Sequence, residues 1–401
     1  MRRALAAAAL CALGGCAPQR GTLDVAQALA AESGGALRPV SAVERREYLR
    51  RARIFDPVDV AARDLMVGPP DRHAFGFRER VSCDFIEPRA DHVPVGGTTP
   101  KFFCRLRHQR RPVDVKIKYG RDNREIYGEL LGSRLLWALG VAVDRDYPVR
   151  VRCHDCPVEP WNAYRDYARP DASPRATRLI DDAVLQRLYP GAPIEECLRL
   201  DGERCAQARS DQGWSFAELD LIDPAVGGAP RAEVDALRLL AAFIAHGDDK
   251  PSNQRLICPF GAVDDAGSCR APRLLVADLG STFGRGASRV LGIIDREARP
   301  SFAAWSSLPM WQDAASCRAY LVARDSASHP QVHEAGRRLL AERLSSLTER
   351  QLRDLFIIAR VEEMGETVAG AGGQSRPVTV DDWVAAFRRR RAAIVDHRCP
   401  E

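Results

Sequence analysis

The stretch that decides the fold is AAFIAHGDDKPSNQRLIC, residues Ala241 to Cys258, in which a polar segment separates two apolar segments. His246, two consecutive aspartates, Lys250, Pro251 and Asn253 all fall within eight positions. The residues before the polar segment, VDALRLLAAFIAH, are apolar nearly all round, which predicts a buried helix. The simplest interpretation of such a polar segment is a surface loop whose Asp and Asn side chains accept hydrogen bonds from backbone amides.

Two short apolar segments follow the polar segment and predict strands. They read QRLIC and RLLVAD, and the second runs directly into Asp278, Leu279 and Gly280. The order is therefore a buried helix, a polar loop, a strand, a connecting loop and a second strand that ends in Asp-Leu-Gly.

The polar segment H-G-D-D-K-P-S-N resembles the protein-kinase catalytic loop H-R-D-L-K-P-E-N. It matches that loop at His246, Asp248, Lys250, Pro251 and Asn253. With the helix before it and the Asp-Leu-Gly after it, the chain resembles the protein-kinase-like superfamily. Its Gly-Asp-x-x-x-x-Asn character is similar to the atypical branches, namely HipA-type, phosphoinositide and secretory-pathway kinases. A full G-x-G-x-x-G and an A-P-E motif are missing, so the resemblance does not predict a substrate-binding surface.

The resemblance implies a bilobal α+β kinase-like fold, with a strand-rich N-lobe over residues 81–150 and a helical C-lobe over residues 151–400. It also implies transfer of a phosphoryl group from ATP, with Mg²⁺ as the metal or Mn²⁺ in its place. Two alternatives remain open at this point. One is a catalytically silent kinase fold that acts as a binding or scaffold module, and the other is nucleotidyl transfer on the same site.

Phosphoryl transfer needs a carboxylate to orient the attacking hydroxyl and oxygen ligands to hold the metal across the phosphates. The resemblance assigns the first role to Asp248 and places Lys250 near the transferring phosphate. It assigns Asn253 and Asp278 as the metal ligands.

A phosphate-binding turn and an ion pair are expected upstream of the loop. VGGTTPKFF offers Gly96 and Gly97 in a turn, where backbone N–H groups can approach phosphates, and Lys101 follows at the start of a strand. A Gly-Gly pair alone more often marks a plain turn.

The strand VDVKIKYG and the following helix, residues 123–140, supply the expected ion pair. Alternation places Lys116 and Lys118 on one face of the strand, with the apolar residues on the other. Lys118 and Glu129 are the predicted pair that positions the nucleotide phosphates, because Glu129 lies beside the apolar stripe of its helix. Lys116 and Glu125 are the second choice.

Lysine usage within the chain supports these motifs. Only four of the 59 basic residues are lysines, at positions 101, 116, 118 and 250. All four fall in the predicted turn, strand and catalytic loop, where a compact ammonium suits phosphate contact and the planar Arg fork does not replace it.

The N-terminus predicts an exported lipoprotein. Arg2 and Arg3 precede a short apolar run that ends in LGGC, which resembles a bacterial lipobox with Cys16 as the lipidated residue. The alternative is a plain signal peptide with a chance cysteine. Residues 1–16 would form the signal, residues 17–40 a tether and residues 41–80 a helical extension. We expect a lipid anchor in the cell envelope, facing the periplasm or the exterior, with the outer membrane favoured in a Gram-negative cell.

Cysteine usage agrees with export. Ten of the twelve cysteines follow Cys16, an even number that favours disulfides in an oxidising compartment. Spacing alone does not fix connectivity, and CHDC at 153–156 could instead be half a zinc site or a redox pair. Near-neighbour pairing predicts five bridges: Cys83–Cys104, Cys153–Cys156, Cys197–Cys205, Cys258–Cys269 and Cys317–Cys399.

The 401-residue chain has 45% hydrophobic and 28% charged residues, an ordinary globular composition. Its net charge of +5 gives no reason to expect nucleic acid as a partner. The expected partners are a nucleotide, an unidentified envelope protein or glycan that supplies a hydroxyl, and a membrane reached only through the lipid anchor. Helical spacing is seen over residues 41–66, and the piece DDAVLQRLY also suggests a short helix.

Overall fold

The computed structural model describes residues 37–70, 74–88, 99–107, 112–165, 173–202, 204–209, 213–284, 286–290, 293–298, 300–322, 329–370 and 373–401, with only the backbone of 286–290 and 293–298. The predicted lipid-attachment residue Cys16, the turn glycines Gly96 and Gly97 and most of the tether lie outside the described residues. The described chain is a mixed α+β structure.

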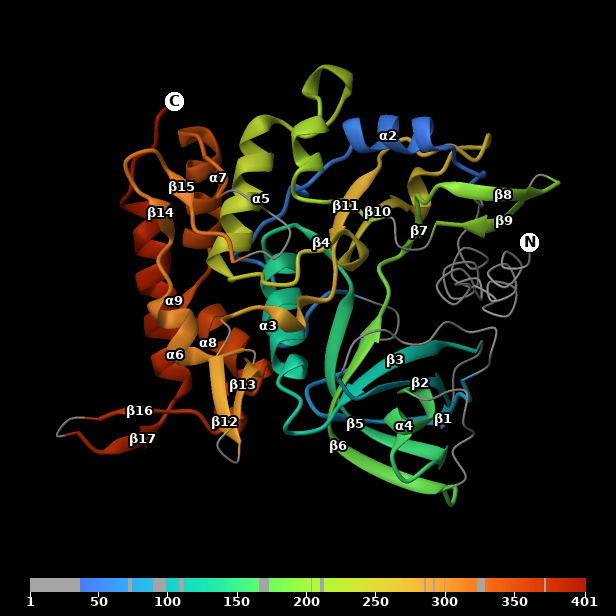
Figure 1. Cartoon of the computed structure of the whole chain (residues 1–401), viewed down its shortest axis with the longest axis vertical. Coiled ribbons are helices and arrows are strands. Elements are labelled where there is room, and N and C mark those ends of the chain that lie inside the picture. The colour runs from blue at the N-terminus through green and yellow to red at the C-terminus, as the bar shows by residue number, and fades with distance from the viewer. Residues whose placement is uncertain are drawn as a thin grey trace, which may run out of the picture.

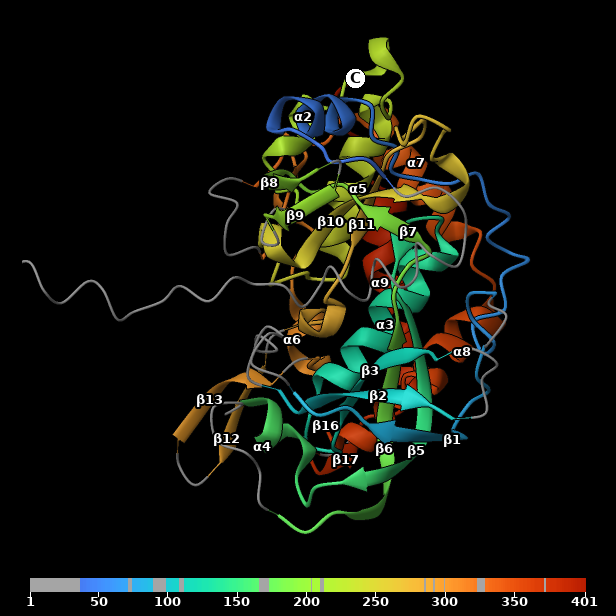
Figure 2. The same cartoon turned by 90° about the vertical axis from the view of Figure 1, so that its right-hand side faces the viewer.

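A closed five-stranded barrel occupies one end of the long axis, and helix α2 (Ala42–Arg50) lies at the other (Figures 1 and 2). The strand order is β1-β2-β3-β6-β5, and β1 closes the barrel by pairing in parallel with β5. Alternate side chains fill the barrel with an apolar core that includes Phe102, Ile117 and Leu185. The strands are β1 Glu79–Phe85, β2 Lys101–Leu106, β3 Asp114–Tyr119, β5 Arg145–Cys156 and β6 Ala176–Arg187.

A second sheet has four strands in the order β4-β11-β10-β7. Its central strands β10 and β11 are antiparallel, and Gln254 of β10 pairs with Val276 of β11. The residue before β10 and the residues after β11 therefore emerge at the same end of the pair. The strands are β4 Ala142–Val143, β7 Gly191–Pro193, β10 Gln254–Pro259 and β11 Arg273–Val276.

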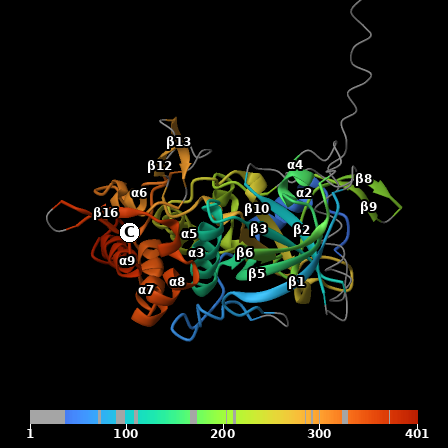
Figure 3. The ribbon, with the colours of Figure 1, turned by 90° about the horizontal axis from the view of Figure 1, so that it is seen from below.

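Helix α3 (Glu125–Ala138) lies between the barrel and the C-terminal helices (Figures 1 and 3). It contacts β5 and β6 on one side and α8 on the other, and nearly all of its side chains are buried. Gly140 follows the helix with a left-handed φ of 89°, as the sequence predicted for the residue that closes it.

The remaining large helices pack beside α3 around an aromatic core (Figure 1). The rings of Trp305 and Trp383 are stacked with their centroids 5.5 Å apart. The predicted buried helix is α5, and capping boxes open α8 at Thr348 and α9 at Thr379, as expected. The helices are α5 Arg231–Phe243, α6 Phe302–Ser307, α7 Glu334–Ser345, α8 Glu349–Ile358 and α9 Val380–Val395.

The smaller elements are one short helix, six 3₁₀ turns and four hairpins within the described residues. The helix is α4 Pro160–Arg165, and the turns are η1 Glu218–Leu221, η2 Pro224–Val226, η3 Pro251–Asn253, η4 Phe260–Ala262, η5 Leu279–Ser281 and η6 Val361–Met364. The hairpin strands are β8 Cys197–Asp201 with β9 Arg204–Ala208, β12 Gly286–Val290 with β13 Ile293–Ala298, β14 Trp311–Asp313 with β15 Arg318–Ala319, and β16 Thr367–Ala369 with β17 Ser375–Pro377.

Two local predictions are wrong. The piece DDAVLQRLY belongs mainly to strand β6, which lies between β3 and β5 and is buried on both faces over residues 183–185. Burial on both faces removes the alternation that identifies a strand. The helical spacing over residues 41–66 yields a helix only to Arg50, because the chain then runs in extended segments that bridge to Arg273 and Val141. Strands β5 and β6 extend the barrel beyond residue 150, as far as Arg187.

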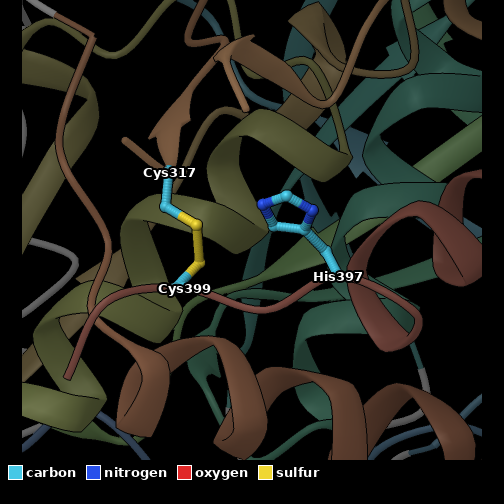
Figure 4. Close-up of side chains that lie close together, drawn as sticks. All are labelled: Cys317, His397 and Cys399. Carbon is cyan, nitrogen blue, oxygen red and sulfur yellow. A yellow bond between two sulfur atoms is a disulfide. The ribbon is translucent and has the colours of Figure 1, made fainter. Parts of the chain in front are cut away.

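All five near-neighbour disulfides predicted from the sequence are present. CHDC forms an internal bridge within β5, so its cysteines are not zinc ligands. His397 lies beside the Cys317–Cys399 bridge (Figure 4), but the two sulfur atoms are bonded to each other, and the imidazole packs against the Trp311 ring at a tilt of 35°. No helix among the described residues is long and apolar enough to span a bilayer.

Candidate active site

The polar loop begins where helix α5 ends. Ala245 adopts a left-handed φ of 50°, and the backbone N–H of His246 donates to the Ala241 carbonyl at 2.9 Å. This conformation is unfavourable for a residue with a Cβ, and it turns the chain sharply out of the buried helix. His246 is 1% exposed, so the turn buries the first residue of the motif, whereas the side chains of Asp248 and Lys250 are 19% and 48% exposed.

Within the loop, one side chain closes the turn around the predicted catalytic carboxylate. The Nδ2 of Asn253 donates to the backbone carbonyl of Asp248 at 3.0 Å. The Nζ of Lys250 lies 3.3 Å from Oδ2 of Asp248, and the Lys250 side chain is 48% exposed. In the described chain, the other oxygen, Oδ1 of Asp248, is buried and has no hydrogen-bond partner. The carboxylate is thus held by its backbone and by one lysine, with one oxygen free to accept a proton.

Asp278, which follows strand β11, lies beside this loop. It adopts a left-handed φ of 51°, and is attached to the loop because the N–H of Ala277 donates to the Asn253 carbonyl at 3.2 Å. A second link joins the N–H of Gly247 to the Ser281 carbonyl at 3.0 Å. The two predicted metal ligands, Asn253 before β10 and Asp278 after β11, therefore lie at the same end of these neighbouring strands.

Lys118 brings the barrel strand, helix α3 and the residues after β11 together. Its Nζ forms a short ion pair with Glu129 and lies 2.9 Å from Oδ1 of Asp278. Glu125 is a third carboxylate, 3.8 Å from the same ammonium. The side chains of Lys118 and Glu129 are 2% and 1% exposed, whereas that of Asp278 is 42% exposed. The cluster is closed toward α3 and open toward the surface at Asp278.

The charges in the cluster set the protonation of its members. Burial alone would lower the pKa of Lys118, but the carboxylates of Asp278, Glu129 and Glu125 outweigh it and raise the pKa well above its usual value. The Lys118 ammonium lowers the pKa of Asp278 far below the ordinary range. Lys118 is therefore a permanent cation and Asp278 a permanent anion at neutral pH.

Glycines allow α3 to approach the turn after Asp278. A Cβ on Gly280 would lie 2.9 Å from Cβ of Glu125 and 3.3 Å from Oε1 of Glu129, and a Cβ on Gly128 would lie 2.5 Å from the Gly280 carbonyl oxygen. Real Cβ atoms do not approach a backbone oxygen so closely. The small residues in the sequence motif and in the helix thus hold Glu129 against Lys118.

Lys101 opens β2 directly opposite Lys118, with which it forms a cross-strand pair. It is 8% exposed, and its Nζ lies 5.5 Å from the centroid of the Trp161 ring. Burial, with the nearby cations Lys118 and Lys116, lowers the pKa of Lys101 to about 8. Thr99, just before the strand, donates to Oε2 of Glu125 at 2.8 Å, which ties the end of the glycine-containing segment to α3.

The donor set fits a hard divalent cation and a phosphate group. Asn253 uses only its Nδ2 toward Asp248, so its Oδ1 remains for a ligand, and Asp278 is half-exposed with a second carboxylate oxygen. Mg²⁺ takes such oxygen ligands and leaves the rest of its sphere to water and phosphates. Lys118 supplies a fixed positive charge on the adjacent sheet, and Lys101 lies directly opposite it.

Two polar residues near the cluster were missed by sequence reasoning. Gln186 and Asp146 lie in strands β6 and β5 in the same row as Lys116 of β3. Because the β6 segment suggested a helix, its polar residues could not be assigned to a sheet face. Their contacts connect residues far apart in the chain, so only the register of the barrel reveals them.

An open groove of about 610 Å³ lies between α2 and the turns η1 and η2, lined chiefly by charged side chains, and it contains none of these residues.

No protein-family model matches the chain, and no curated protein sequence matches it. Among solved structures, the chain is similar to the crystal structure of the Helicobacter pylori proinflammatory kinase CtkA. The two share 9% sequence identity, the match covers 80% of this chain and 96% of the other, and the TM-score is 0.36. At this level the likeness adds nothing about individual side chains, and the chemistry of the site rests on its own residues.

Proposed function

We propose that this protein is an atypical kinase-like phosphotransferase that uses ATP and Mg²⁺, with Mn²⁺ as a substitute. The barrel with α3 would form the small lobe of a bilobal kinase-like fold, and the remaining helices the large lobe. One observation carries the proposal: Lys118 contacts Glu129 and Asp278 at once, while Asp278 lies beside the loop that holds Asp248 and Asn253.

In this proposal, the metal would neutralise charge on the phosphates, and Asn253 and Asp278 would hold it. Lys118 and Lys101 would bind phosphate oxygens as point charges. Glu129 keeps the Lys118 ammonium in place, because the two side chains are buried together.

Asp248 would orient the acceptor hydroxyl and take its proton through the free Oδ1. Lys250, beside the other oxygen, would neutralise charge on the transferred group. Positioned groups of this type supply most of the catalysis in phosphoryl transfer, because the reaction requires little covalent participation of the protein.

The compartment and acceptor are part of the proposal. Five disulfides are typical of a chain that matures in an oxidising compartment. We therefore propose a lipid anchor at Cys16, a location in the cell envelope, with the outer membrane favoured, and a hydroxyl of an envelope protein or glycan as the acceptor. Contact with the membrane would be through the anchor alone.

Thermal unfolding with and without Mg-ATP tests the nucleotide site. The wild type should be stabilised by Mg-ATP, since a ligand that binds only the folded state raises the Tm. Asp278→Ala should lose the Mg-dependent part of the shift, whereas Asp265→Ala, an exposed aspartate in the loop between β10 and β11, should retain it. No shift in the wild type, or an equal shift in Asp278→Ala, would contradict the proposal and favour a silent scaffold.

A further inference from the structure

The wall of the barrel away from the candidate active site carries a group of arginines. In the closed order β1-β2-β3-β6-β5, strand β3, which holds Lys118, is separated by one strand from β1 and by one strand from β5. The parallel pair β1–β5 therefore forms the side of the barrel opposite β3. Along this pair, Val81 and Cys83 of β1 and Val151 of β5 fill the interior, so the residues between them point outward.

Three arginines lie together on this outer surface. Arg80 of β1 is directly opposite Arg150 of β5, and Arg152 follows two residues further along β5. Neighbouring strands lie about 4.8 Å apart and alternate residues of a strand about 7 Å apart, so the three side chains start from one small area. We call Arg80, Arg150 and Arg152 the arginine face.

The arginine face has little negative charge of its own. Among the described residues, the exposed side chains of Arg80 and Arg152 form no hydrogen bond or ion pair. Arg150 lies 3.9 Å from Asp181, and the two side chains are 43% and 71% exposed. An exposed pair at this distance contributes little to stability. Like charges on facing residues of adjacent strands repel each other, and a bound anion would remove that repulsion.

The arginines beside this face are paired with carboxylates. Arg107, whose backbone N–H donates to the Ser82 carbonyl, donates from its Nε to Asp84 at 2.8 Å. Arg105 donates twice to Asp114, at 2.7 and 2.9 Å. Exposed arginines of the barrel thus take a carboxylate where one is near, and the arginine face is the place where the chain supplies almost none.

Uncharged groups continue the same surface. Ser82 lies opposite Arg152, and its hydroxyl is 2.8 Å from Nε2 of His154. The other ring nitrogen of His154 lies 3.2 Å from the Thr177 hydroxyl. On the far side of Arg152, strand β6 places Leu179, which is 66% exposed. The surface therefore combines guanidinium groups, hydroxyls and an apolar side chain, which suit the carboxylates, hydroxyls and ring C–H groups of a charged sugar.

The position of the arginine face favours a polymer over the anchoring membrane. The described chain begins at residue 37, just before α2, and α2 lies at the opposite end of the long axis from the barrel (Figures 1 and 2). A chain anchored at Cys16 is held at its α2 end, which leaves the barrel end for other molecules.

We infer that the arginine face binds an acidic glycan, a polysaccharide whose carboxylates repeat along an extended chain. A guanidinium group binds a carboxylate through two parallel N–H···O bonds, so each arginine can take one carboxylate of the chain. Sugar rings are rigid, so such a chain loses less conformational freedom on binding than a flexible acidic peptide. The inference does not depend on phosphoryl transfer, because the surface would hold the protein on the glycan whether or not the candidate active site transfers phosphate.

Calorimetric titration of the purified protein with hexagalacturonate, which has one carboxylate on each sugar, tests the inference. The neutral sugar maltohexaose and the acidic peptide hexaglutamate are titrated in parallel. Hexagalacturonate should bind at least about fivefold more tightly than hexaglutamate, and maltohexaose should not bind. Binding should weaken as the ionic strength rises from about 0.05 to about 0.5 M, because salt screens exposed charges.

A triple variant locates the binding surface. Arg80→Gln, Arg150→Gln and Arg152→Gln together should weaken hexagalacturonate binding at least about tenfold. If this variant does not fold, as judged by circular dichroism, Arg152→Gln alone replaces it. The matched control changes the net charge by the same amount at three arginines of the C-terminal part that are more than half exposed, and it should bind within about twofold of the wild type. Its substitutions are Arg338→Gln, Arg350→Gln and Arg398→Gln.

Three outcomes overturn the inference. Equal affinity of the triple variant and the control would show that net charge or another surface attracts the glycan. Hexaglutamate binding as tight as that of hexagalacturonate would indicate an acidic protein as the partner instead. Absence of hexagalacturonate binding to the folded wild type at low ionic strength would show that the face does not bind this class of ligand. None of these outcomes bears on the proposed nucleotide site, because the titrations contain no nucleotide.

Discussion

The ammonium of Lys118 lies 2.9 Å from the Oδ1 of Asp278, although 160 positions separate the two residues in the chain. Lys118 comes from a barrel strand and Asp278 from the end of β11. The same ammonium is paired with Glu129 of α3, so three elements meet at one buried charge. Several measurements follow from this junction.

Removing the Lys118 charge should destabilise the protein strongly. Glu129 is 1% exposed, so Lys118→Met leaves a buried carboxyl without its partner, which costs about 3–5 kcal/mol. The double variant Lys118→Met with Glu129→Gln removes both charges and should be more stable than Lys118→Met alone. Urea unfolding of the two single variants and the double variant measures the coupling. Strictly additive losses would show that the pair is not coupled.

Inserting a methyl group between α3 and η5 should separate Glu129 from Lys118. Gly128→Ala places a Cβ 2.5 Å from the Gly280 carbonyl oxygen, so we expect a loss of about 1–3 kcal/mol and weaker binding of Mg-tripolyphosphate. Gly261→Ala is the matched control, because nothing lies within 4 Å of its added Cβ. Equal stability and binding of the two variants would contradict the close packing described for α3.

Much of the candidate site was predictable because its signals are local. The spacing from Asp248 to Asn253 fixes both on one loop, and each predicted disulfide except Cys317–Cys399 joins cysteines at most 21 residues apart. In contrast, β6 is buried on both faces over residues 183–185 and shows no strand alternation there, so its Gln186 was missed. The contact of Gly128 with Gly280 depends on how a helix packs on a distant turn, which no local pattern encodes.

The buried Lys101 should make stability depend on pH in the alkaline range. Its pKa is about 8 in the folded protein and about 10.5 when unfolded, so between these values the unfolded state binds more protons. Wild-type stability should therefore rise relative to Lys101→Met as the pH increases from 8 to about 10.5. The difference should be constant below pH 7, where Lys101 is protonated in both states. Urea unfolding at several pH values measures it, and a pH-independent difference would show that Lys101 keeps an ordinary pKa.

The Cys258–Cys269 bridge closes the loop between the two predicted metal ligands, Asn253 and Asp278. Replacing both cysteines by alanine should cost about 3 kcal/mol through loop entropy and should also weaken Mg-dependent nucleotide binding. Cys197 and Cys205 offer a comparison, since their bridge lies in the hairpin β8–β9. Their double alanine variant should lose stability but keep nucleotide affinity. Equal effects on binding would indicate that both bridges act only through global stability.

The central claim is that Asp248 acts in transfer of a phosphoryl group from ATP. The most direct measurement is incorporation of label from γ-labelled Mg-ATP into acceptors of a cell-envelope extract, with α-labelled ATP in parallel. The wild type should transfer the γ label and not the α label, and Asp248→Asn should reduce transfer at least about 100-fold while still binding Mg-ATP. Transfer of the α label would indicate nucleotidyl transfer instead. No transfer by the folded wild type, or undiminished transfer by Asp248→Asn, would contradict the account.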